Sequence, residues 1–549
     1  MTMKDKTDFR VLIVYPNLPL MLVPSLSVSI FTRILKGQGY AVKLFETTGY
    51  LPPEVDSSSP ENRVKFSQAR NFDYEHDLGI KPRRSDMCVD FREEVSAFQP
   101  DLILYSVVED AFLQCISLMT AINDLAIAHL VGGVFPTSAP ETCFKHPVIR
   151  QIALGEGEKI VLEMAEAIRL GLPTENINGV WTRLPDGRIR KNTRPPLVDI
   201  GKYRPDFSLF DERRFYRPMG GKIFRTMPIE TYRGCPFTCT FCNSPMQTSQ
   251  SRAAGLGNFL RRKNMTQLRE ELREVIDRYH PEFFYFIDDS FLARPYREIF
   301  EFCNMYEEYK LPFWFNTRPE ACTEDVLIRL KEVGAYRISF GIESGNEEFR
   351  RNVLQRRNNN RQIIESFERI AASGIAFSVN LIIGFPGETR EHVMDTVELV
   401  RSICGYDSIT VSIFTPYHGA KLREVAVRNG WLDPNTITVH TTSRSLLSMP
   451  APYLSAGDID GLMRVVPLYC YFPKDQWERL RRAETADAEG DAVLAEFMDI
   501  YKSEFLGLTQ EEKLRHYVEG GTGCRANSND AFYFSPSRLS DEAIASLQS

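Results

Sequence analysis

Three closely spaced cysteines are the residues of this sequence best suited to metal chemistry. Cys235, Cys239 and Cys242 lie within the stretch RGCPFTCTFCNSP. A Cys-x3-Cys-x2-Cys loop can direct three thiolates to three corners of a [4Fe–4S] cluster, and it leaves the fourth iron open to a substrate or cofactor. A zinc site would need a fourth ligand, and no other Cys or His lies within 30 residues on either side. The spacing therefore favours such a cluster over zinc or metal-free buried thiols.

Length and composition indicate a globular protein of several domains. The chain has 549 residues and a net charge of −7, so nothing at this level predicts a nucleic-acid surface. The start, MTMKDKTDF, carries charges where a signal peptide would need an apolar core, and the most apolar run, VLIVYPNLPLMLV, is too short to cross a membrane. We expect a cytoplasmic protein without a membrane span, in which clustered cysteines bind metal or do chemistry.

The first part of the chain alternates apolar segments with amphipathic ones. RVLIVYP, AVKLFE, PDLILYS and HLVGG have the apolar character of buried parallel strands. This order predicts a doubly wound, flavodoxin-like α/β domain over residues 1–175, with a polar insertion at about 47–90. In such a sheet the ligand site lies at the carboxyl ends of the strands.

The alternation resumes after a linker predicted over 176–224, which includes a small hairpin at GVWTRLPDGRIRK. Strands are expected at FFYFIDD, PFWFNT, YRISFGIESG, SVNLIIGFPGE and SITVSIFTPY. Because helical segments fill most of the gaps, we expect a partial (β/α)6 barrel over 225–425, with the cysteine loop at the carboxyl ends of its strands. A mainly helical region over 426–525 and an irregular tail over 526–549 complete the predicted organisation.

Five motifs of the predicted barrel occur together in the order of one family. RGCPFTCTFCNSP, DDSF, FGIESG, GFPGET and TPYHG follow one another along this part of the chain. Together they resemble the radical S-adenosylmethionine (radical SAM) superfamily. The resemblance implies that the three cysteines bind a [4Fe–4S] cluster and that SAM chelates the open iron. It also implies that an electron from the reduced cluster cleaves SAM to methionine and a 5′-deoxyadenosyl radical.

The same resemblance implies roles for residues near the strand ends. Phe241 is expected to lie against the adenine of SAM, and Gly384 to let the backbone approach that ring. Asp288 or Asp289 would meet the amino group, and Glu343 would bind the ribose hydroxyls or face the sulfonium. Each position could instead hold an ordinary strand-end polar residue or turn glycine.

Two departures from the family pattern stand out. Ala420 follows TPYHG, where relatives often carry Thr, and the segment after FGIESG is rich in Arg and Asn. We expect its arginines to form a solvated face, with a site for an anionic substrate as the alternative. They are Arg350, Arg351, Arg356, Arg357 and Arg361.

The N-terminal domain resembles the cobalamin-binding domain that is joined to one branch of this superfamily. The matching stretches are the loop after RVLIVYP, then LYSVVED, and LVGGVFPTSAPE with ALGEGE. Small residues at strand ends would let a flat corrinoid and its tail approach the backbone, and Ser106, Gly132 and Gly133 are the candidates. An ordinary flavodoxin-like domain is the alternative. The first loop, PNLPLMLVPSL, contains no His, so the resemblance implies cobalamin without a histidine ligand from this loop.

These resemblances imply a cobalamin-dependent radical SAM enzyme. We expect a C-methyltransferase that acts on an unactivated carbon of a small-molecule or natural-product substrate, with a reducing partner such as flavodoxin or ferredoxin and no nucleic acid. Cobalamin would carry a methyl group from one SAM, and a second SAM would supply the radical. The sequence does not identify the substrate or a catalytic acid or base.

Three alternatives stay open. Cyclisation, rearrangement or oxidation without methyl transfer would use the same architecture. A methylthiotransferase would need a second cluster, and Cys88, Cys115 and Cys143 do precede the triad, although Cys115 lies within a predicted helix. A non-catalytic iron–sulfur or corrinoid carrier is the third alternative, and the complete motif set argues against it.

Overall fold

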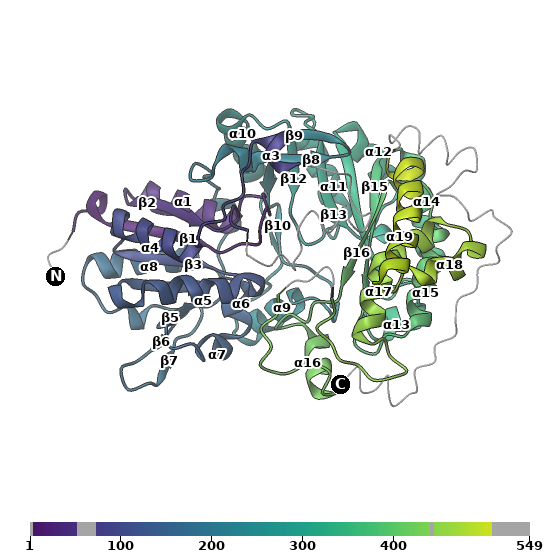
Figure 1. Ribbon diagram of the computed structural model, residues 1–549. Coiled ribbons are helices and arrows are strands. Elements are labelled where there is room, and N and C mark those ends of the chain that lie inside the picture. Colours follow the sequence, from purple (N-terminus) through teal and green to yellow (C-terminus); the bar gives the residue numbers. More distant parts are fainter. Residues whose placement is uncertain (1–3, 52–72, 440–443, 508–549) are drawn as a thin grey trace.

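Two mainly parallel sheets organise the protein, one in each half of the molecule (Figure 1). The structure is a computed structural model that describes residues 4–51, 73–439 and 444–507. Within them, the front sheet has the strand order β2-β1-β3-β4-β5-β6-β7, and the barrel sheet has the order β16-β15-β14-β13-β12-β9-β8.

The front sheet confirms the predicted doubly wound fold. Its first five strands are parallel and follow the flavodoxin-like order 2-1-3-4-5. The hairpin expected within the linker extends this sheet, because β6 pairs antiparallel with β5. The strands are β1 (Arg10–Tyr15), β2 (Ala41–Glu46), β3 (Leu102–Ser106), β4 (Ala128–Gly132), β5 (Gln151–Ala153), β6 (Val180–Arg183) and β7 (Ile189–Lys191).

Helices cover both faces of the front sheet. Val11 and Ile13 of β1 pack in the cluster that contains α1 and α8, whereas Leu12 and Val14 pack in the cluster that contains α4 and α5. Because both faces are buried, these strands read as continuous apolar runs and leave room for a ligand only at their ends. The helices are α1 (Leu26–Gly37), α3 (Tyr74–Leu78), α4 (Met87–Phe98), α5 (Phe112–Ala121), α6 (Val134–Ser138), α7 (Pro140–Cys143) and α8 (Glu158–Arg169).

The barrel sheet confirms the predicted partial barrel. Six parallel strands form a curled half-barrel, and the short strand β8 pairs antiparallel with its edge. The strands are β8 (Tyr216–Met219), β9 (Lys222–Ile229), β12 (Phe283–Phe286), β13 (Phe313–Thr317), β14 (Ala335–Glu343), β15 (Ala376–Ile383) and β16 (Ser408–Ile413).

Capping residues define the helices that cover the outside of the half-barrel. Asn264 and Gln267 form a capping box at the start of α10, and Asn359 and Gln362 do so for α14, which ends at the left-handed Gly374. The helices of this half are α9 (Ser244–Ala253), α10 (Met265–Tyr279), α11 (Tyr296–Tyr306), α12 (Glu324–Glu332), α13 (Glu347–Asn352), α14 (Asn360–Ser373), α15 (Arg390–Arg401) and α16 (Lys421–Arg428).

The two faces of the barrel sheet differ in polarity. Ile338 and Phe340 of β14 are fully buried under the helices. Ser339 and Gly341 of the same strand point the other way, since successive side chains alternate, and they line a cavity on the concave face. The half-barrel thus has an apolar outer face and a concave face that is open to a ligand.

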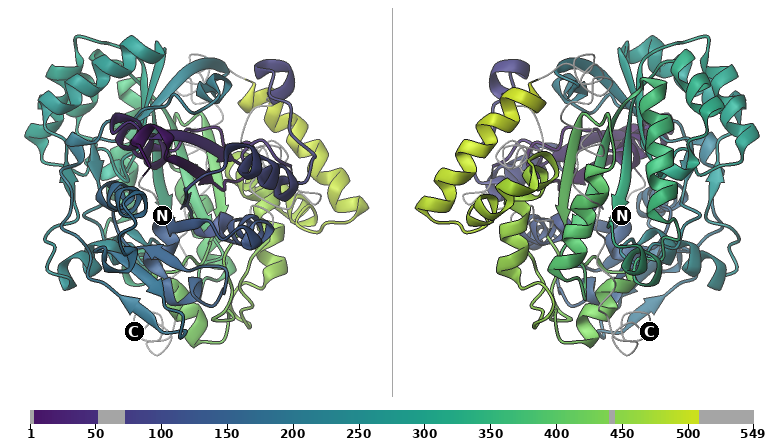
Figure 2. Two further views of the ribbon diagram at one scale, coloured as in Figure 1. Left: turned by 90° about the vertical axis from the view of Figure 1, so that its left-hand side faces the viewer. Right: turned by 90° about the vertical axis from the view of Figure 1, so that its right-hand side faces the viewer.

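The last described helices pack at the end of the barrel sheet away from the front sheet (Figure 1). They are α17 (Ala456–Tyr471), α18 (Trp477–Arg482) and α19 (Ala488–Tyr501), and they confirm a mainly helical C-terminal region. Arg401 at the end of α15 donates to the backbone carbonyl of Phe472 at 2.7 Å and so ties α15 to these helices. Figure 2 shows them, in yellow, at one side of the molecule.

Among the described helices, none combines the length and the apolar character that crossing a membrane requires. The tail predicted over 526–549 lies outside the described residues.

Candidate active site

The cysteine loop lies at the carboxyl ends of the barrel strands. It connects β10 (Tyr232–Arg233) to α9, and all three cysteines line a cavity of about 1050 Å³ on the concave face of the barrel sheet, here called the barrel cavity. Gly234 has a φ of +96°, and a Cβ at this position would lie 2.9 Å from the ring of Phe259. Glycine is therefore required where the chain turns into the loop.

Hydrogen-bond donors approach the sulfur atoms of this loop. Arg318, just after β13, donates from Nη2 to Sγ of Cys239 at 2.7 Å, and its guanidinium lies 3.5 Å from the ring centroid of Phe237. Burial raises the pKa of Cys235 to about 11 and that of Cys242 to about 12, so these thiols are neutral until a metal favours the thiolate. In the described part of the chain, no three His, Cys, Asp or Glu side chains are grouped tightly enough for a single metal ion.

Three residues predicted to contact SAM line the barrel cavity: Phe241, Asp289 and Glu343. Phe241 packs against Phe385, with 5.7 Å between the ring centroids. Asp289, just after β12, accepts a hydrogen bond from Oγ of Ser244 at 2.9 Å, and burial raises the pKa of its carboxyl group. These side chains line the same cavity as the three cysteines, and their contact with SAM stays a prediction.

Glu343, at the end of β14, also lines the barrel cavity. It accepts a hydrogen bond from Nη1 of Arg356 at 2.7 Å and has a φ of +67°, which is unusual for a residue other than glycine. Burial raises the pKa of Glu343, and Arg356 opposes this rise. A charged side chain is therefore held at the strand end by an ion pair and by an uncommon backbone conformation.

Two other residues predicted to contact SAM, Asp288 and Gly384, do not line the barrel cavity. Asp288 is 3% exposed, accepts from the backbone N–H groups of Thr231 and Tyr232, and forms an ion pair with Arg294. The N–H of Gly384 donates to Glu388, and a Cβ on Gly384 would lie 3.0 Å from Ile459. Asp288 thus anchors the strand before the cysteine loop, and a SAM contact by either residue stays a prediction.

The structure corrects the expectation for the arginine-rich segment. Arg351, Arg357 and Arg361 are exposed as expected, but Arg350 and Arg356 are buried, at 1% and 6% exposure. Arg350 donates to the carbonyl of Ser344 at 2.7 Å, while Arg356 holds Glu343. These two arginines therefore support the strand end instead of facing solvent.

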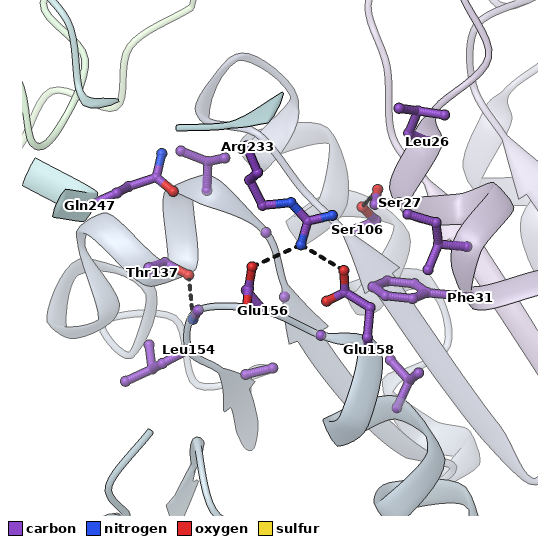
Figure 3. Close-up of a pocket in the computed structure, with 18 of the residues that line it drawn as sticks. Leu26, Ser27, Phe31, Ser106, Thr137, Leu154, Glu156, Glu158, Arg233 and Gln247 are labelled. Atoms are coloured by element: carbon purple, nitrogen blue, oxygen red, sulfur yellow. Dashed lines mark hydrogen bonds and ion pairs between the residues drawn. The ribbon is translucent and has the colours of Figure 1, made fainter. Parts of the chain in front are cut away.

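A second cavity, here called the front cavity, lies at the carboxyl ends of the front strands (Figure 3). It measures about 400 Å³, and the predicted residues Ser106, Gly132 and Gly133 all line it. Oγ of Ser106 lies 3.0 Å from Oγ of Ser27. Gly133 has a φ of +126°, and a Cβ there would lie 2.2 Å from the carbonyl oxygen of Val107, so only glycine fits. The described lining contains no histidine.

A cluster of charged side chains lies on the wall of the front cavity (Figure 3). Arg233, two residues before Cys235, donates to Glu156 at 2.8 Å and to Glu158 at 2.7 Å, and it also pairs with Glu230. Arg261 provides a second cation for Glu156. In the sequence, ALGEGE resembles only a cobalamin-domain motif, and no local pattern indicates that its glutamates hold Arg233 beside the cysteine loop.

A second contact joins the motifs LYSVVED and TPYHG. Nδ1 of His418 lies 2.7 Å from Glu109, and Oη of Tyr417 donates to Asp110 at 2.8 Å. Asp289 lines both cavities, so the two cavities meet at the start of the DDSF segment. The sequence identified both motifs, but it contained no signal that they contact each other across some 300 residues.

Comparison with known proteins agrees with these features. The sequence model of the Radical SAM superfamily matches residues 229–400. An uncharacterized methyltransferase of Pyrococcus horikoshii is 26% identical over 349 residues, which are 62% of this chain and 73% of that protein.

Two solved structures share the fold over most of the chain. The cobalamin-dependent radical enzyme OxsB, solved with aqua-cobalamin and SAM bound, has a TM-score of 0.59 at 15% identity and covers 90% of this chain and 71% of its own. The radical SAM methyltransferase TsrM of Kitasatospora setae, solved with cobalamin and a [4Fe–4S] cluster, has a TM-score of 0.56 at 16% identity and covers 90% of both chains. This chain is therefore a radical SAM enzyme with the fold of the cobalamin-dependent members of that superfamily.

Proposed function

We propose that the protein is a cobalamin-dependent radical SAM C-methyltransferase that acts on a small molecule and receives electrons from a flavodoxin or ferredoxin. The main support for this proposal is that Asp289 lines both the barrel cavity, which contains the three cysteines, and the front cavity. A methyl carrier and a radical source would thus lie on either side of one substrate, and holding reactants in register is the main contribution a protein makes to such chemistry.

The cysteine loop fits a cluster with one open iron. Cys235, Cys239 and Cys242 supply three soft sulfur donors on one wall of the barrel cavity. The hydrogen bond from Arg318 to Cys239 suits a thiolate, which accepts such bonds better than a thiol does. The rest of the cavity leaves room for SAM beside the loop.

The surrounding side chains fit SAM. We assign the contact with its amino group to Asp289, because Asp288 is already used by Thr231, Tyr232 and Arg294. Glu343 is positioned for the ribose or sulfonium side, and Phe241 supplies an aromatic face for the adenine.

The front cavity fits part of a corrinoid. The strand ends carry only small residues, so a flat ligand could approach the backbone there. These residues are Ser106, Gly132 and Gly133. Val108 and Val134, exposed at 41% and 38%, also line the cavity and offer an apolar surface that a ligand would cover. Because the described lining has no histidine, cobalt would receive no histidine ligand from it.

The bound groups would supply chemistry that the chain cannot perform alone: a reduced cluster cleaves SAM to a carbon radical, and cobalamin delivers a methyl group. The chain's own residues position these groups. Arg318 and the buried ring of Phe385 behind Phe241 shield the loop, and Asp289 would orient SAM at the junction of the cavities.

The relatives support methyl transfer. The Pyrococcus relative and TsrM are both named methyltransferases. A methylthiotransferase is disfavoured, because Cys115 and Cys143 are fully buried in the core of the front domain and line neither cavity, which leaves the three front cysteines unable to share a cluster.

The test is an anaerobic assay with reconstituted cluster, reductant and added cobalamin. We expect 5′-deoxyadenosine from SAM in every reduced sample, and S-adenosylhomocysteine only when cobalamin is present. 5′-Deoxyadenosine without cobalamin-dependent S-adenosylhomocysteine would contradict methyl transfer and favour cyclisation or rearrangement.

A further inference from the structure

The concave face of the barrel sheet carries rows of polar residues, which is unusual for the inside of a barrel. Strand register places Asn316 beside Ser339, Ser339 beside Ser378, and Ser378 beside Ser408, so one row of four polar side chains crosses four strands. The interior of a closed barrel is normally filled by branched apolar residues. Here all four side chains line the barrel cavity.

A second row lies closer to the cysteine loop. Gly341 is paired with Asn380, and Asn380 with Thr410. Asn380 and Thr410 line the cavity, and within the described residues neither side chain has a hydrogen-bond partner. Ser412, two residues after Thr410 on β16, also lines the cavity, and its side chain likewise has no hydrogen-bond partner within the described residues. A polar group left without a partner costs free energy unless water or a ligand satisfies it.

The second row lies at a depth in the barrel where a substrate could bind beneath SAM. Gly341 precedes Glu343 by two residues, so the row lies about 7 Å further into the barrel than the proposed SAM contact. The cavity volume of about 1050 Å³ lies at the upper end of the range that a single drug-sized ligand fills. Space therefore remains beneath SAM for a second molecule.

The base of the cavity is polar as well. Arg337 forms an ion pair with Asp407, and the Trp314 indole, which donates to Ser339 at 2.8 Å, stacks on Tyr285 with 4.1 Å between ring centroids. A hydrocarbon in this position would cover charged and hydroxyl groups without replacing their contacts with water.

We infer that the substrate is a hydrophilic small molecule rich in hydroxyl or amide groups, and that Asn380 and Thr410 bind it through hydrogen bonds. This inference rests on the proposed methyltransferase function and adds the substrate class. It excludes a purely hydrocarbon substrate, which would cover the polar rows without replacing their contacts with water, even though Met219, Ile223, Leu381 and Ile382 also line the cavity.

The experiment uses the reconstituted full chain with cobalamin, reductant and SAM that carries a tritiated methyl group. A deproteinised extract of the organism that carries the gene supplies the substrate, and the products are divided into aqueous and organic phases. We expect tritium in an aqueous small molecule other than SAM and methionine, because unreacted SAM and the methionine left by its reductive cleavage both keep the labelled methyl group. Tritium recovered in the organic phase would overturn the inference.

Paired variants test the two residues. The apolar variant Asn380→Leu with Thr410→Val keeps side-chain size, and we expect at least a tenfold loss of aqueous label at unchanged iron content and melting temperature. The polar variant Asn380→Ser with Thr410→Ser should retain most of the label. If the double variant does not fold, Thr410→Val alone should still lower the label. Full labelling by a folded apolar variant would overturn the inference.

Failure of the proposed function has a different signature. In that case the native enzyme forms no cobalamin-dependent S-adenosylhomocysteine even without extract, and neither phase contains a labelled compound other than SAM and methionine. Formation of S-adenosylhomocysteine together with label in the organic phase would overturn the substrate class alone.

Discussion

The front cavity and the barrel cavity both belong to parallel sheets, but each uses its sheet differently. Helices cover both faces of the front sheet, so its cavity is confined to the strand ends, where Ser106, Gly132 and Gly133 provide space by being small. The barrel sheet buries only its outer face, and its cavity runs along the strands from Arg337 to Glu343. A small residue makes room in the first case, and sheet curvature makes room in the second.

This difference determines which residues can bear chemistry in each half. The front cavity can accept a preformed flat ligand at a backbone edge, whereas the barrel cavity presents whole rows of side chains that can recognise a substrate. The two cavities meet at Asp289, and the ion pairs of Arg233 lie on the wall of the front cavity, two residues before Cys235.

The largest effect is expected in the barrel cavity. Cys239→Ala removes one of three cluster ligands, so 5′-deoxyadenosine should fall to background while cobalamin binding by the front domain persists. Iron analysis and product quantification measure the first effect, and an optical titration measures the second. The control Cys88→Ala removes a half-buried thiol outside both cavities and should leave both unchanged. Normal 5′-deoxyadenosine formation by Cys239→Ala would contradict the assignment.

The ion pairs of Arg233 come next. Arg233→Met leaves the buried Glu156 and Glu158, 8% and 4% exposed, without this cation, and breaking a buried charge cluster in this way costs about 3–5 kcal/mol. Denaturant unfolding should show this loss, and the control Arg361→Met at an exposed helix position should not. Equal stability of the Arg233 variant and the native chain would show that the cluster does not hold the two halves together.

The same cluster predicts a pH dependence. Burial would raise the pKa of Glu156, but Arg261 and Arg233 hold it below the ordinary value of 4.5. Because the folded state has the lower pKa, the stabilisation is complete above about pH 4.5 and is lost as the pH falls through the lowered value. Acid unfolding of the native chain should therefore be steeper than that of Arg233→Met. Parallel acid curves would contradict this account.

The front cavity should respond to added volume. Gly132→Val places a side chain in the cavity, and its Cβ meets only an ordinary contact with Ala153 at 3.5 Å. We expect cobalamin to bind at least tenfold more weakly, or about 1.4 kcal/mol, with the cluster unaffected. The control Gly49→Ala introduces a methyl group where no atom lies within 4 Å. Equal cobalamin affinities of the two variants would place cobalamin elsewhere.

The smallest effect is expected at Arg318. Its guanidinium donates to Sγ of Cys239, and hydrogen bonds and positive charge near cluster sulfurs favour the reduced state. Arg318→Met should therefore lower the midpoint potential of the cluster, on the order of tens of millivolts, in a redox titration followed by electron paramagnetic resonance. An unchanged or higher potential would show that this hydrogen bond does not persist in the loaded enzyme.

Much of the architecture could be predicted because it depends on local patterns. Continuous apolar strands indicated the front sheet, and the cysteine spacing with its four companion motifs indicated the barrel. The three cysteines, Phe241, Asp289 and Glu343 line one cavity, and Ser106, Gly132 and Gly133 line the other, although their contacts with cofactors stay predictions.

The remainder depends on contacts between distant residues. Asp288 and Asp289 have the same side chain, and only the fold shows that Asp288 is held by Thr231 and Arg294 while Asp289 faces both cavities. Arg350 and Arg356 looked like a solvated face because charge patterning does not identify buried acceptors. The partnership of Arg233 with ALGEGE joins residues some 75 positions apart, which no local pattern encodes.

The most direct test counts metals in one preparation of the full chain, reconstituted anaerobically with iron, sulfide and cobalamin and then freed of unbound cofactors. We expect about four irons and about one cobalt per chain, with an optical spectrum that shows both a cluster and a corrinoid. Zinc in place of iron, or a full cluster with no retained cobalt, would contradict it.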